Sequence, residues 1–284
     1  MKELLVATIS MCSGDDKSKN VDVALSKVRE AAKLGAKWVL LPEIFSYHGP
    51  YHSLHDAAEY PDSPLLQSLS GVARETKITL FAGSVGERPR ESTGYEALNA
   101  KGDKKVHNTM FVFGPDGSLL ERYRKTHLFN LLDGEGKALY CESEGFIPGH
   151  RAVAFEHDGW RVGLAICYDL RFPEFFGLLA KSQALDIIVI PSAFTEGTGK
   201  DHWEVLLRAR AIEHQCYVLA SNQCGEHRPG KRSYGHSMII DPWGCKIADT
   251  GDDAGIALAV IGQDSLQKVR ARLPALANKR RDLY

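Results

Sequence analysis

The sequence predicts a single α/β domain, spanning residues 1–284, with its layers in the order helix, sheet, sheet, helix. Three observations support this prediction. Several strands are continuously apolar, which is typical of a sheet covered by helices on one face and by another sheet on the other. Strand–helix units are mixed with hairpins, which predicts both parallel and antiparallel pairing. No linker-like, repeated or low-complexity segment divides the chain.

The first half of the chain supplies five of the predicted elements and one loop. Residues 4–11 form an apolar run typical of a strand, and residues 18–33 carry apolar side chains at helical spacing. The apolar residues in 36–45 predict a buried strand. Pro42, just before Glu43, is expected to end its regular pairing. Ser63 as a cap and Pro64 at the first position begin a helix over residues 63–76. The remaining predictions are a polar loop over 49–62 and a strand over 78–87.

The second half alternates hairpins, helices and apolar strands. Two hairpins are predicted, over 107–125 around a Gly-Pro-Asp-Gly turn and over 152–167 around an Asp-Gly turn. Between them, residues 131–148 are rich in glycine and have no clear periodicity. The later predictions are helices after 173, over 202–215 and from 264 onward, strands over 186–194 and 216–225, and a hairpin over 236–249.

The composition is that of an ordinary soluble globular protein. Thirty-five basic and thirty-six acidic residues in a chain of 284 give no overall field that would attract nucleic acid or an anionic membrane. Six cysteines are too thinly spread for a disulfide-built domain, so we expect reduced thiols and a cytoplasmic protein. We find neither a signal peptide nor a run long enough to cross a membrane, and therefore expect no membrane partner.

Cys167 is the strongest single candidate for chemistry. It follows the apolar run Val162–Ile166 and precedes Pro173 and Glu174, which are typical of a first helical turn. A side chain at such a corner projects from the sheet, and the backbone N–H groups after it can receive an oxyanion. The positive end of a helix also favours a thiolate over a thiol. The alternative is that Cys167 is merely a buried strand residue.

Three charged residues stand just beyond predicted strands and could serve such a thiol. Glu43 or Glu142 could accept its proton, and Lys125 could supply positive charge for a tetrahedral oxyanion. Each also has an ordinary interpretation: Glu43 as a turn cap, Lys125 as one of a basic run on a strand edge, and Glu142 as a loop acid. Spacing alone does not show that they meet.

Other catalytic arrangements are less well supported. A Cys–His pair is possible among eleven histidines, of which His127 is the most suggestive. Cys224 and His227 form only a fragment of a zinc-binding pattern, and we expect no metal site. No glycine-rich loop for phosphate groups is present.

Three blocks carry a resemblance that covers nearly the whole chain. LLPEIF around Glu43, RYRKTHLF around Lys125 and ICYDLRFPE around Cys167 follow the order of the catalytic blocks of the carbon–nitrogen hydrolase, or nitrilase, superfamily, which the chain resembles. The resemblance implies an αββα sandwich with Glu43 as general base, Lys125 as oxyanion donor and Cys167 as nucleophile. It also implies that Glu142 is a second, supporting glutamate, that the protein is a homodimer or larger homo-oligomer, and that no cofactor is needed.

A narrower likeness concerns the substrate. Residues 191–227 and 233–244 are similar to the Nit branch of the superfamily, which implies hydrolysis of an amide in a 2-oxo acid derived from glutathione. On this reading the Tyr168 N–H assists Lys125, Arg171 binds a substrate carboxylate, and Phe194 and Thr198 line the opposite wall. Arg171 could instead form an ion pair with Asp169 or Glu174.

We therefore expect an amidase that acts on a small, carboxylate-bearing amide through a Cys167 thioester. An ω-amidase or a nitrilase with the same three residues is the alternative enzyme. A binding or scaffold protein built on a hydrolase fold is the non-enzymatic alternative.

Overall fold

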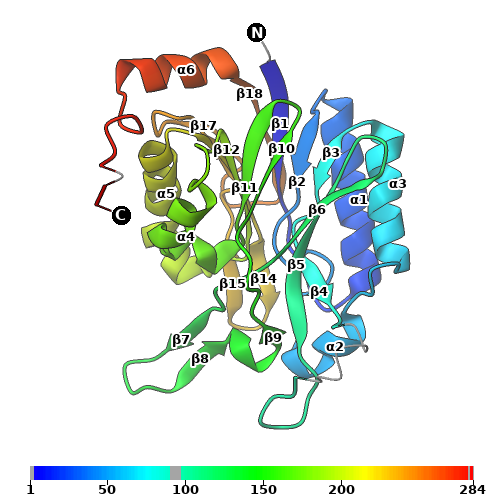
Figure 1. Cartoon of the computed structure of the whole chain (residues 1–284). Coiled ribbons are helices and arrows are strands. Elements are labelled where there is room, and N and C mark those ends of the chain that lie inside the picture. The colour runs from blue at the N-terminus through cyan, green and yellow to red at the C-terminus, as the bar shows by residue number, and fades with distance from the viewer. Residues whose placement is uncertain (1–2, 90–96, 281, 284) are drawn as a thin grey trace.

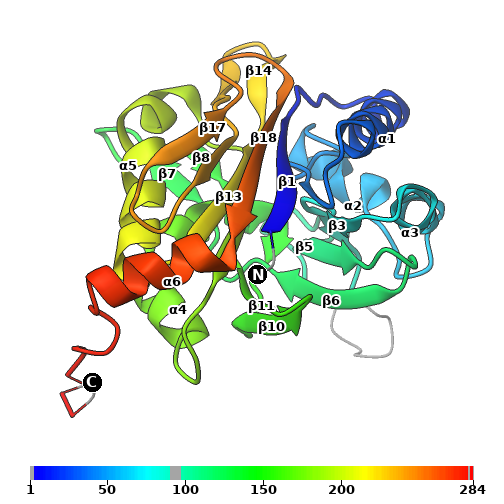
Figure 2. The ribbon, with the colours of Figure 1, turned by 90° about the horizontal axis from the view of Figure 1, so that it is seen from above.

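The computed structural model, which describes residues 3–89, 97–280 and 282–283, has the four layers that the sequence predicts (Figure 1). Seen from above, helices α1 and α3 lie outside one sheet and α4 and α5 lie outside the other (Figure 2). The predicted α/β class and helix–sheet–sheet–helix order are thus confirmed. The predicted domain limits, residues 1 and 284, lie outside the described residues.

The first sheet has the strand order β18–β1–β2–β3–β5–β4, with β6 and β9 also paired to β5. Strands β1, β2 and β3 run parallel, whereas β18 is antiparallel to β1 and β5 is antiparallel to β3, β4 and β6 but parallel to β9. Its strands are β1 (Glu3–Ser10), β2 (Trp38–Leu40), β3 (Thr79–Phe81), β4 (Val85–Glu87), β5 (Val106–Phe113), β6 (Leu119–Arg124), β9 (Phe146–Ile147) and β18 (Gly255–Gly262).

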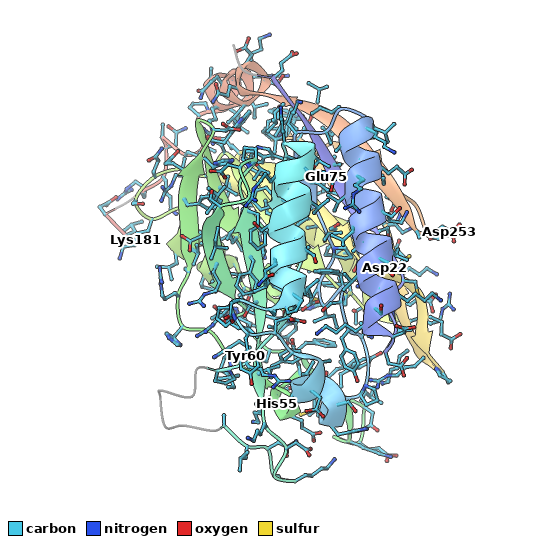
Figure 3. All side chains as sticks on the ribbon, turned by 90° about the vertical axis from the view of Figure 1, so that its right-hand side faces the viewer. Asp22, His55, Tyr60, Glu75, Lys181 and Asp253 are labelled. Carbon is cyan, nitrogen blue, oxygen red and sulfur yellow. The ribbon has the colours of Figure 1, made fainter. Side chains whose placement is uncertain are left out.

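Two amphipathic helices cover the outer face of this sheet. They are α1 (Lys17–Lys33), capped by the Asp16 side chain, and α3 (Pro64–Thr76), capped by Ser63 as predicted. Figure 3 shows the two helices side by side, and Arg29 of α1 pairs with Glu75 of α3 at 2.9 Å. The short helix α2 (Leu54–Ala57), preceded by a 3₁₀ turn η1 (Tyr51–Ser53), lies in the segment predicted as a loop.

The second sheet has the order β10–β11–β12–β13–β16–β17, and three helices accompany it. The turn between β10 and β11 has positive φ at Asp158 (56°) and Gly159 (77°), the conformation that the predicted Asp-Gly hairpin requires. The elements are β10 (Val153–His157), β11 (Trp160–Leu164), β12 (Ile187–Ser192), β13 (Tyr217–Asn222), β16 (Met238–Ile240), β17 (Lys246–Asp249), α4 (Pro173–Leu179), α5 (Glu196–His214) and α6 (Gln263–Arg272).

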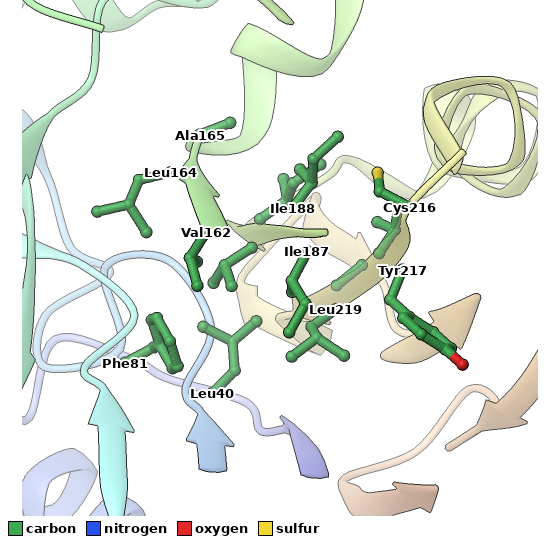
Figure 4. Close-up of a cluster of buried hydrophobic side chains, with 14 of the residues drawn as sticks. Leu40, Phe81, Val162, Leu164, Ala165, Ile187, Ile188, Cys216, Tyr217 and Leu219 are labelled. Carbon is green, nitrogen blue, oxygen red and sulfur yellow. The ribbon is translucent and has the colours of Figure 1, made fainter. Parts of the chain in front are cut away.

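The main core lies between the two sheets. Leu40 and Phe81 of the first sheet face Val162, Ile187 and Leu219 of the second (Figure 4), and all five are buried. Burying each such side chain contributes about 1.5–3 kcal/mol. This apolar layer fixes the separation of the sheets, and with it the separation of any groups that each sheet carries to its edge.

A polar connection joins the two sheets at one end of this core. Ser221 of β13 accepts a hydrogen bond from Ile9 N–H at 2.9 Å and donates to the carbonyl of Leu40 at 2.9 Å. Ser10 donates to the carbonyl of Asn222 at 3.0 Å. The carboxyl ends of β1, β2 and β13 are therefore held together, and the residues that follow these strands lie close to one another.

Several predicted boundaries are wrong. The strand predicted over 36–45 is formed only at β2, and Gly83 divides the next one into β3 and β4. The segment 131–148, predicted to be irregular, contains the hairpin of β7 (Asn130–Leu132) and β8 (Ala138–Cys141), the 3₁₀ turn η3 (Glu142–Glu144) and β9. The chain after β13 forms a further hairpin, β14 (Cys224–Arg228) with β15 (Lys231–Tyr234).

All six cysteines are unpaired thiols. Within the described residues, no helix is both long enough and apolar enough to span a bilayer. The same part of the chain holds no group of three or more histidine, cysteine, aspartate or glutamate side chains arranged to bind a metal ion.

Candidate active site

Glu43 lies in the turn after β2, where the backbone is tightly constrained. Gly83, with φ of 51°, passes so close that a Cβ there would meet the carbonyl oxygen of Pro42 at 2.0 Å. Gln223, at the end of the second sheet, donates to the Glu43 carbonyl at 2.9 Å. Oε2 of Glu43 accepts a hydrogen bond from Ala193 N–H at 2.8 Å. Both sheets therefore hold this carboxylate in one orientation.

Lys125 lies between two carboxylates. Its Nζ is 2.8 Å from Oε1 of Glu43, and 2.9 and 2.8 Å from the two oxygens of Glu142. Asn108 of β5 donates to both glutamates, at 2.9 and 3.2 Å. Glu142 also accepts from Phe129 N–H at 2.6 Å. The structure thus brings together three of the residues that the sequence singles out, and Asn108 links the two acids.

Cys167 occupies the corner predicted for it. It follows β11 after two residues and opens the 3₁₀ turn η4 (Cys167–Arg171), with α4 beginning at Pro173. Its φ of 48° is rare for a residue with a side chain, and such strain is typical of a nucleophile elbow. Asp169 fixes the corner, because its Oδ2 accepts from Ile166 N–H at 2.9 Å and from the Tyr123 hydroxyl at 2.6 Å.

The charges around the thiol explain its protonation. Burial raises the pKa of Cys167 well above its usual range, the Glu43 charge raises it further, and Lys125 opposes the rise. Burial would lower the pKa of Lys125, but Glu142 and Glu43 together raise it well above its usual value. The helix end was expected to favour a thiolate, but burial and the Glu43 charge outweigh any such effect and raise the pKa of Cys167. Both shifts favour a protonated thiol beside an ammonium, so a nucleophilic role for this thiol requires a base.

The effect of Glu43 on the thiol is testable. Glu43→Gln removes a negative charge that raises the pKa of Cys167, so we expect the pKa of this thiol to fall even though its candidate base is lost. The pH dependence of Cys167 alkylation by iodoacetamide, followed by mass spectrometry, measures the change. Glu174→Gln, which alters an exposed acid on α4, is the matched control and should leave the titration where it is. An unchanged or higher pKa in Glu43→Gln would contradict this account.

Two hollows meet at Cys167. The first, named here the Arg171 hollow, is lined by Phe129, Cys167, Tyr168, Arg171, Ala193, Phe194, Thr195 and Thr198. The second, the Arg228 hollow of about 80 Å³, is lined by Glu43, Ile44, His48, Gly49, Tyr51, Lys125, Phe129, Tyr140, Glu142, Phe146, Cys167, Ala193, Thr195 and Arg228. The thiol therefore opens on two spaces, one carrying the predicted substrate residues and the other the glutamates and the lysine.

The sequence left the role of Arg171 open between substrate binding and an ion pair, and residues 3–89, 97–280 and 282–283 offer it no acidic partner. Its guanidinium lies 5.0 Å from the Phe194 ring centre and 3.2 Å from Nδ1 of His202. Asp169 instead bonds Nδ1 of His127 at 2.7 Å. Arg171 thus faces the Arg171 hollow with its charge uncompensated by a carboxylate among the described residues.

The competing histidine and metal interpretations find no support. The His127 ring is engaged by Asp169 and stacks on Phe172 at 3.8 Å, and it lines neither hollow. The two ring nitrogens of His227 lie 2.7 Å from the Ser13 carbonyl oxygen and 2.8 Å from the Ser233 hydroxyl. His227 therefore has no free nitrogen with which to join Cys224 at a metal.

Several site residues are absent from the sequence predictions. Asn108 lies between His107 and Thr109, a polar stretch in the fully buried strand β5, and this stretch was the available signal. Ala193 contributes only its backbone N–H, for which a sequence has no signal. Phe129 lines both hollows from the loop before β7, and Arg228 lines the second from the end of β14. The sequence does not reveal the path of either segment.

Comparison with known proteins gives a consistent result. The family model described as carbon–nitrogen hydrolase matches residues 5–271. The chain is 40% identical to human deaminated glutathione amidase over 99% of this chain and 83% of that protein. It is 39% identical to mouse omega-amidase NIT2 over 100% of this chain and 98% of that protein. The crystal structure of Saccharomyces cerevisiae Nit3, a member of branch 10 of the nitrilase superfamily, superimposes with a TM-score of 0.83 at 30% identity, over 99% of this chain and 97% of Nit3.

Proposed function

Since this chain belongs to the carbon–nitrogen hydrolase family, we propose that it hydrolyses the amide bond of a small carboxylate-bearing substrate through a thioester on Cys167. Its similarity to relatives named as amidases shows that the chain is an amidase. One observation carries the finer proposal: the Glu43 carboxylate and the Lys125 ammonium, 2.8 Å apart, share a hollow with the Cys167 thiol.

The first half of the proposed reaction makes the thioester. Glu43 takes the proton of the Cys167 thiol as the sulfur attacks the amide carbonyl carbon. The ammonium of Lys125 and the N–H of Tyr168 stabilise the negative charge that forms on the carbonyl oxygen. Glu43 then gives its proton to the amide nitrogen, the C–N bond breaks, and the amine leaves. The acyl group remains bound to the sulfur.

The second half restores the enzyme. Glu43 removes a proton from water, whose oxygen attacks the thioester carbon, and the same two donors stabilise the second oxyanion. The C–S bond breaks, the acid product leaves, and the proton returns to the Cys167 sulfur. Glu142 acts through Lys125, since its two contacts and the Phe129 N–H hold the ammonium in place.

The substrate follows from the relatives and from the Arg171 hollow. Deaminated glutathione and 2-oxoglutaramate carry the same 2-oxo acyl group, and relatives named for deaminated glutathione and for ω-amidase activity are about equally similar to this chain. We propose that Arg171 binds the carboxylate of this acyl group, with Phe194 and Thr198 beside it. Deaminated glutathione is the substrate we favour, with ω-amidase activity as the second candidate. The homo-oligomeric assembly and the cytoplasmic location stay predictions.

A substrate panel tests this proposal. We expect wild-type enzyme to release amine from deaminated glutathione and ammonia from 2-oxoglutaramate, and to turn over the nitrile corresponding to 2-oxoglutaramate far more slowly than the amide. Product formation from each compound, measured by mass spectrometry, is the readout, with Cys167→Ala as the blank. Hydrolysis of the nitrile alone would replace the proposal with a nitrilase. If the enzyme hydrolysed neither amide, the proposed function would be wrong.

A further inference from the structure

Besides Lys125 and Arg171, Arg228 is a third cation that lines the hollows meeting at Cys167, and the proposed mechanism does not use it. It ends β14 and is half-buried in the Arg228 hollow, whereas Arg171 lies in the other hollow. The neighbouring residue His227 fixes this strand, because its ring stacks on that of His48, with ring centres 3.9 Å apart, and bonds Ser13. An arginine is thus held at each side of Cys167.

Arg228 differs from Lys231 and Arg232 of its hairpin, because among the described residues its guanidinium contacts neither an ion-pair nor a hydrogen-bond partner. Lys231 lies over the Tyr140 ring at 3.8 Å and donates to the Leu139 carbonyl at 3.1 Å. Arg232 pairs with Glu196 at 3.1 Å. Among the residues that the structure describes, the guanidinium of Arg228 forms neither an ion pair nor a side-chain hydrogen bond.

The charge of Arg228 nevertheless affects the pKa values of residues that line the Arg228 hollow. Burial raises the pKa of Tyr140, and the charge of Arg228 opposes that rise. Burial lowers the pKa of His48 to about 3, and Arg228 contributes in the same direction, so this imidazole is neutral at physiological pH. A half-buried guanidinium without a counter-charge is well suited to bind a ligand carboxylate.

The proposed chemistry determines which part of the substrate enters this hollow. The leaving nitrogen must lie beside Glu43, which donates its proton, and Glu43 lines the Arg228 hollow but not the Arg171 hollow. The acyl group, bound through Arg171, therefore extends to one side of the thiol. The leaving amine extends to the other side, toward Arg228.

The Arg228 hollow has room for more than ammonia. It adjoins an outer hollow of about 420 Å³, and Tyr51 and Arg228 line both. Asp103 and Glu144 also line the outer hollow, and neither lies within ion-pair distance of Arg228. A leaving group several bonds long can therefore pass Tyr51 and reach the guanidinium from the thiol side.

We propose that Arg228 binds a carboxylate on the leaving amine, so that the enzyme prefers peptide-like amides whose amine half carries its own acid group. This inference rests on the proposed amidase function. It assigns the two arginines to the two ends of a substrate with carboxylates at both ends, as in deaminated glutathione. The primary amide 2-oxoglutaramate uses Arg171 alone.

Three substrates with the same acyl group test the assignment. They are deaminated glutathione, the same compound with its C-terminal carboxylate converted to a carboxamide, and 2-oxoglutaramate. We expect wild-type enzyme to prefer the carboxylate over the carboxamide by about tenfold or more in kcat/KM, the size of a charge-assisted hydrogen bond at a partly exposed site. We expect Arg228→Met to abolish this preference and Arg228→Lys to retain part of it.

Arg232→Met is the matched control, since it removes a cation of the same hairpin that lines neither hollow, and the preference should survive. If Arg228→Met lowered kcat/KM equally for the carboxylate and the carboxamide substrates, the assignment would be overturned. So would a wild-type enzyme that does not distinguish the two compounds. Failure of the proposed function gives a different result, because wild type would then hydrolyse none of the three.

Discussion

Cys167→Ala is expected to lower kcat for amide hydrolysis by about 10⁴-fold or more, because the proposed mechanism has no thioester without the sulfur. The fold should survive, since alanine is smaller than cysteine and the side chain is only 7% exposed at a corner that Asp169 holds by other atoms. Steady-state amine release measures the loss, and a thermal melt establishes that the variant is folded.

Cys216→Ala supplies the matched control, because Cys216 is a buried thiol that lines neither hollow. We expect this variant to lose some stability and to keep its turnover. Wild-type enzyme mixed rapidly with substrate should also show the mass of an acyl group on the peptide that contains Cys167. Turnover of Cys167→Ala within tenfold of wild type would contradict the assignment of the nucleophile.

Lys125→Met is expected to damage both stability and activity. The ammonium is 2% exposed and neutralises two carboxylates, so its removal leaves buried charge uncompensated and should cost about 3–5 kcal/mol in the free energy of unfolding. Loss of the proposed oxyanion donor should lower kcat by about 10²–10³-fold. Chemical denaturation and steady-state kinetics measure the two effects separately.

The stability loss should depend on pH with a definite sign. Burial raises the pKa of Glu142 and Lys125 partly offsets the rise, so removing Lys125 raises this pKa further. A group whose pKa is higher in the folded state stabilises the fold below its unfolded pKa, about 4.3, and loses that contribution as the pH rises through the folded value. The cost of Lys125→Met should therefore be largest at neutral pH and shrink on acidification.

Two further variants make this prediction specific. The double variant Lys125→Met/Glu142→Gln also removes one of the two uncompensated carboxylate charges. It should recover part of the stability without recovering activity. Lys137→Met, which changes an exposed lysine of the β7–β8 turn, should leave stability within about 0.5 kcal/mol of wild type. A Lys125→Met protein as stable as wild type at neutral pH would show that the two carboxylates are not both charged beside Lys125.

Local patterns predicted much of the secondary structure. Ser63 and Pro64 indicated the start of α3 because capping is a property of a few consecutive residues. The turn after β10 was predicted for the same reason, because the Asp-Gly pair alone favours it. The strand after residue 36 was overextended because apolar side chains continue past Leu40, where pairing stops and the chain turns to place Glu43.

The site could be predicted only in part, for a physical reason. Cys167, Glu43 and Lys125 each have a recognisable neighbourhood in the sequence, whereas their meeting point depends on how the two sheets pack. Ala193 participates through a backbone N–H that any residue but proline would supply. Arg228 reaches the site from a hairpin that was not predicted, because the strand predicted over 216–225 ends before this residue.

The division of the site between the sheets has a consequence for how the protein matures. Asn108 lies in the first sheet, and Glu43 and Lys125 follow its strands β2 and β6, whereas Cys167 and Ala193 follow strands β11 and β12 of the second. A growing polypeptide on the ribosome carries the thiol with no base beside it until the halves of the sandwich dock. The proposed nucleophile therefore meets its proposed base only when the two sheets pack against each other, and a copy whose sheets are not packed has no assembled site.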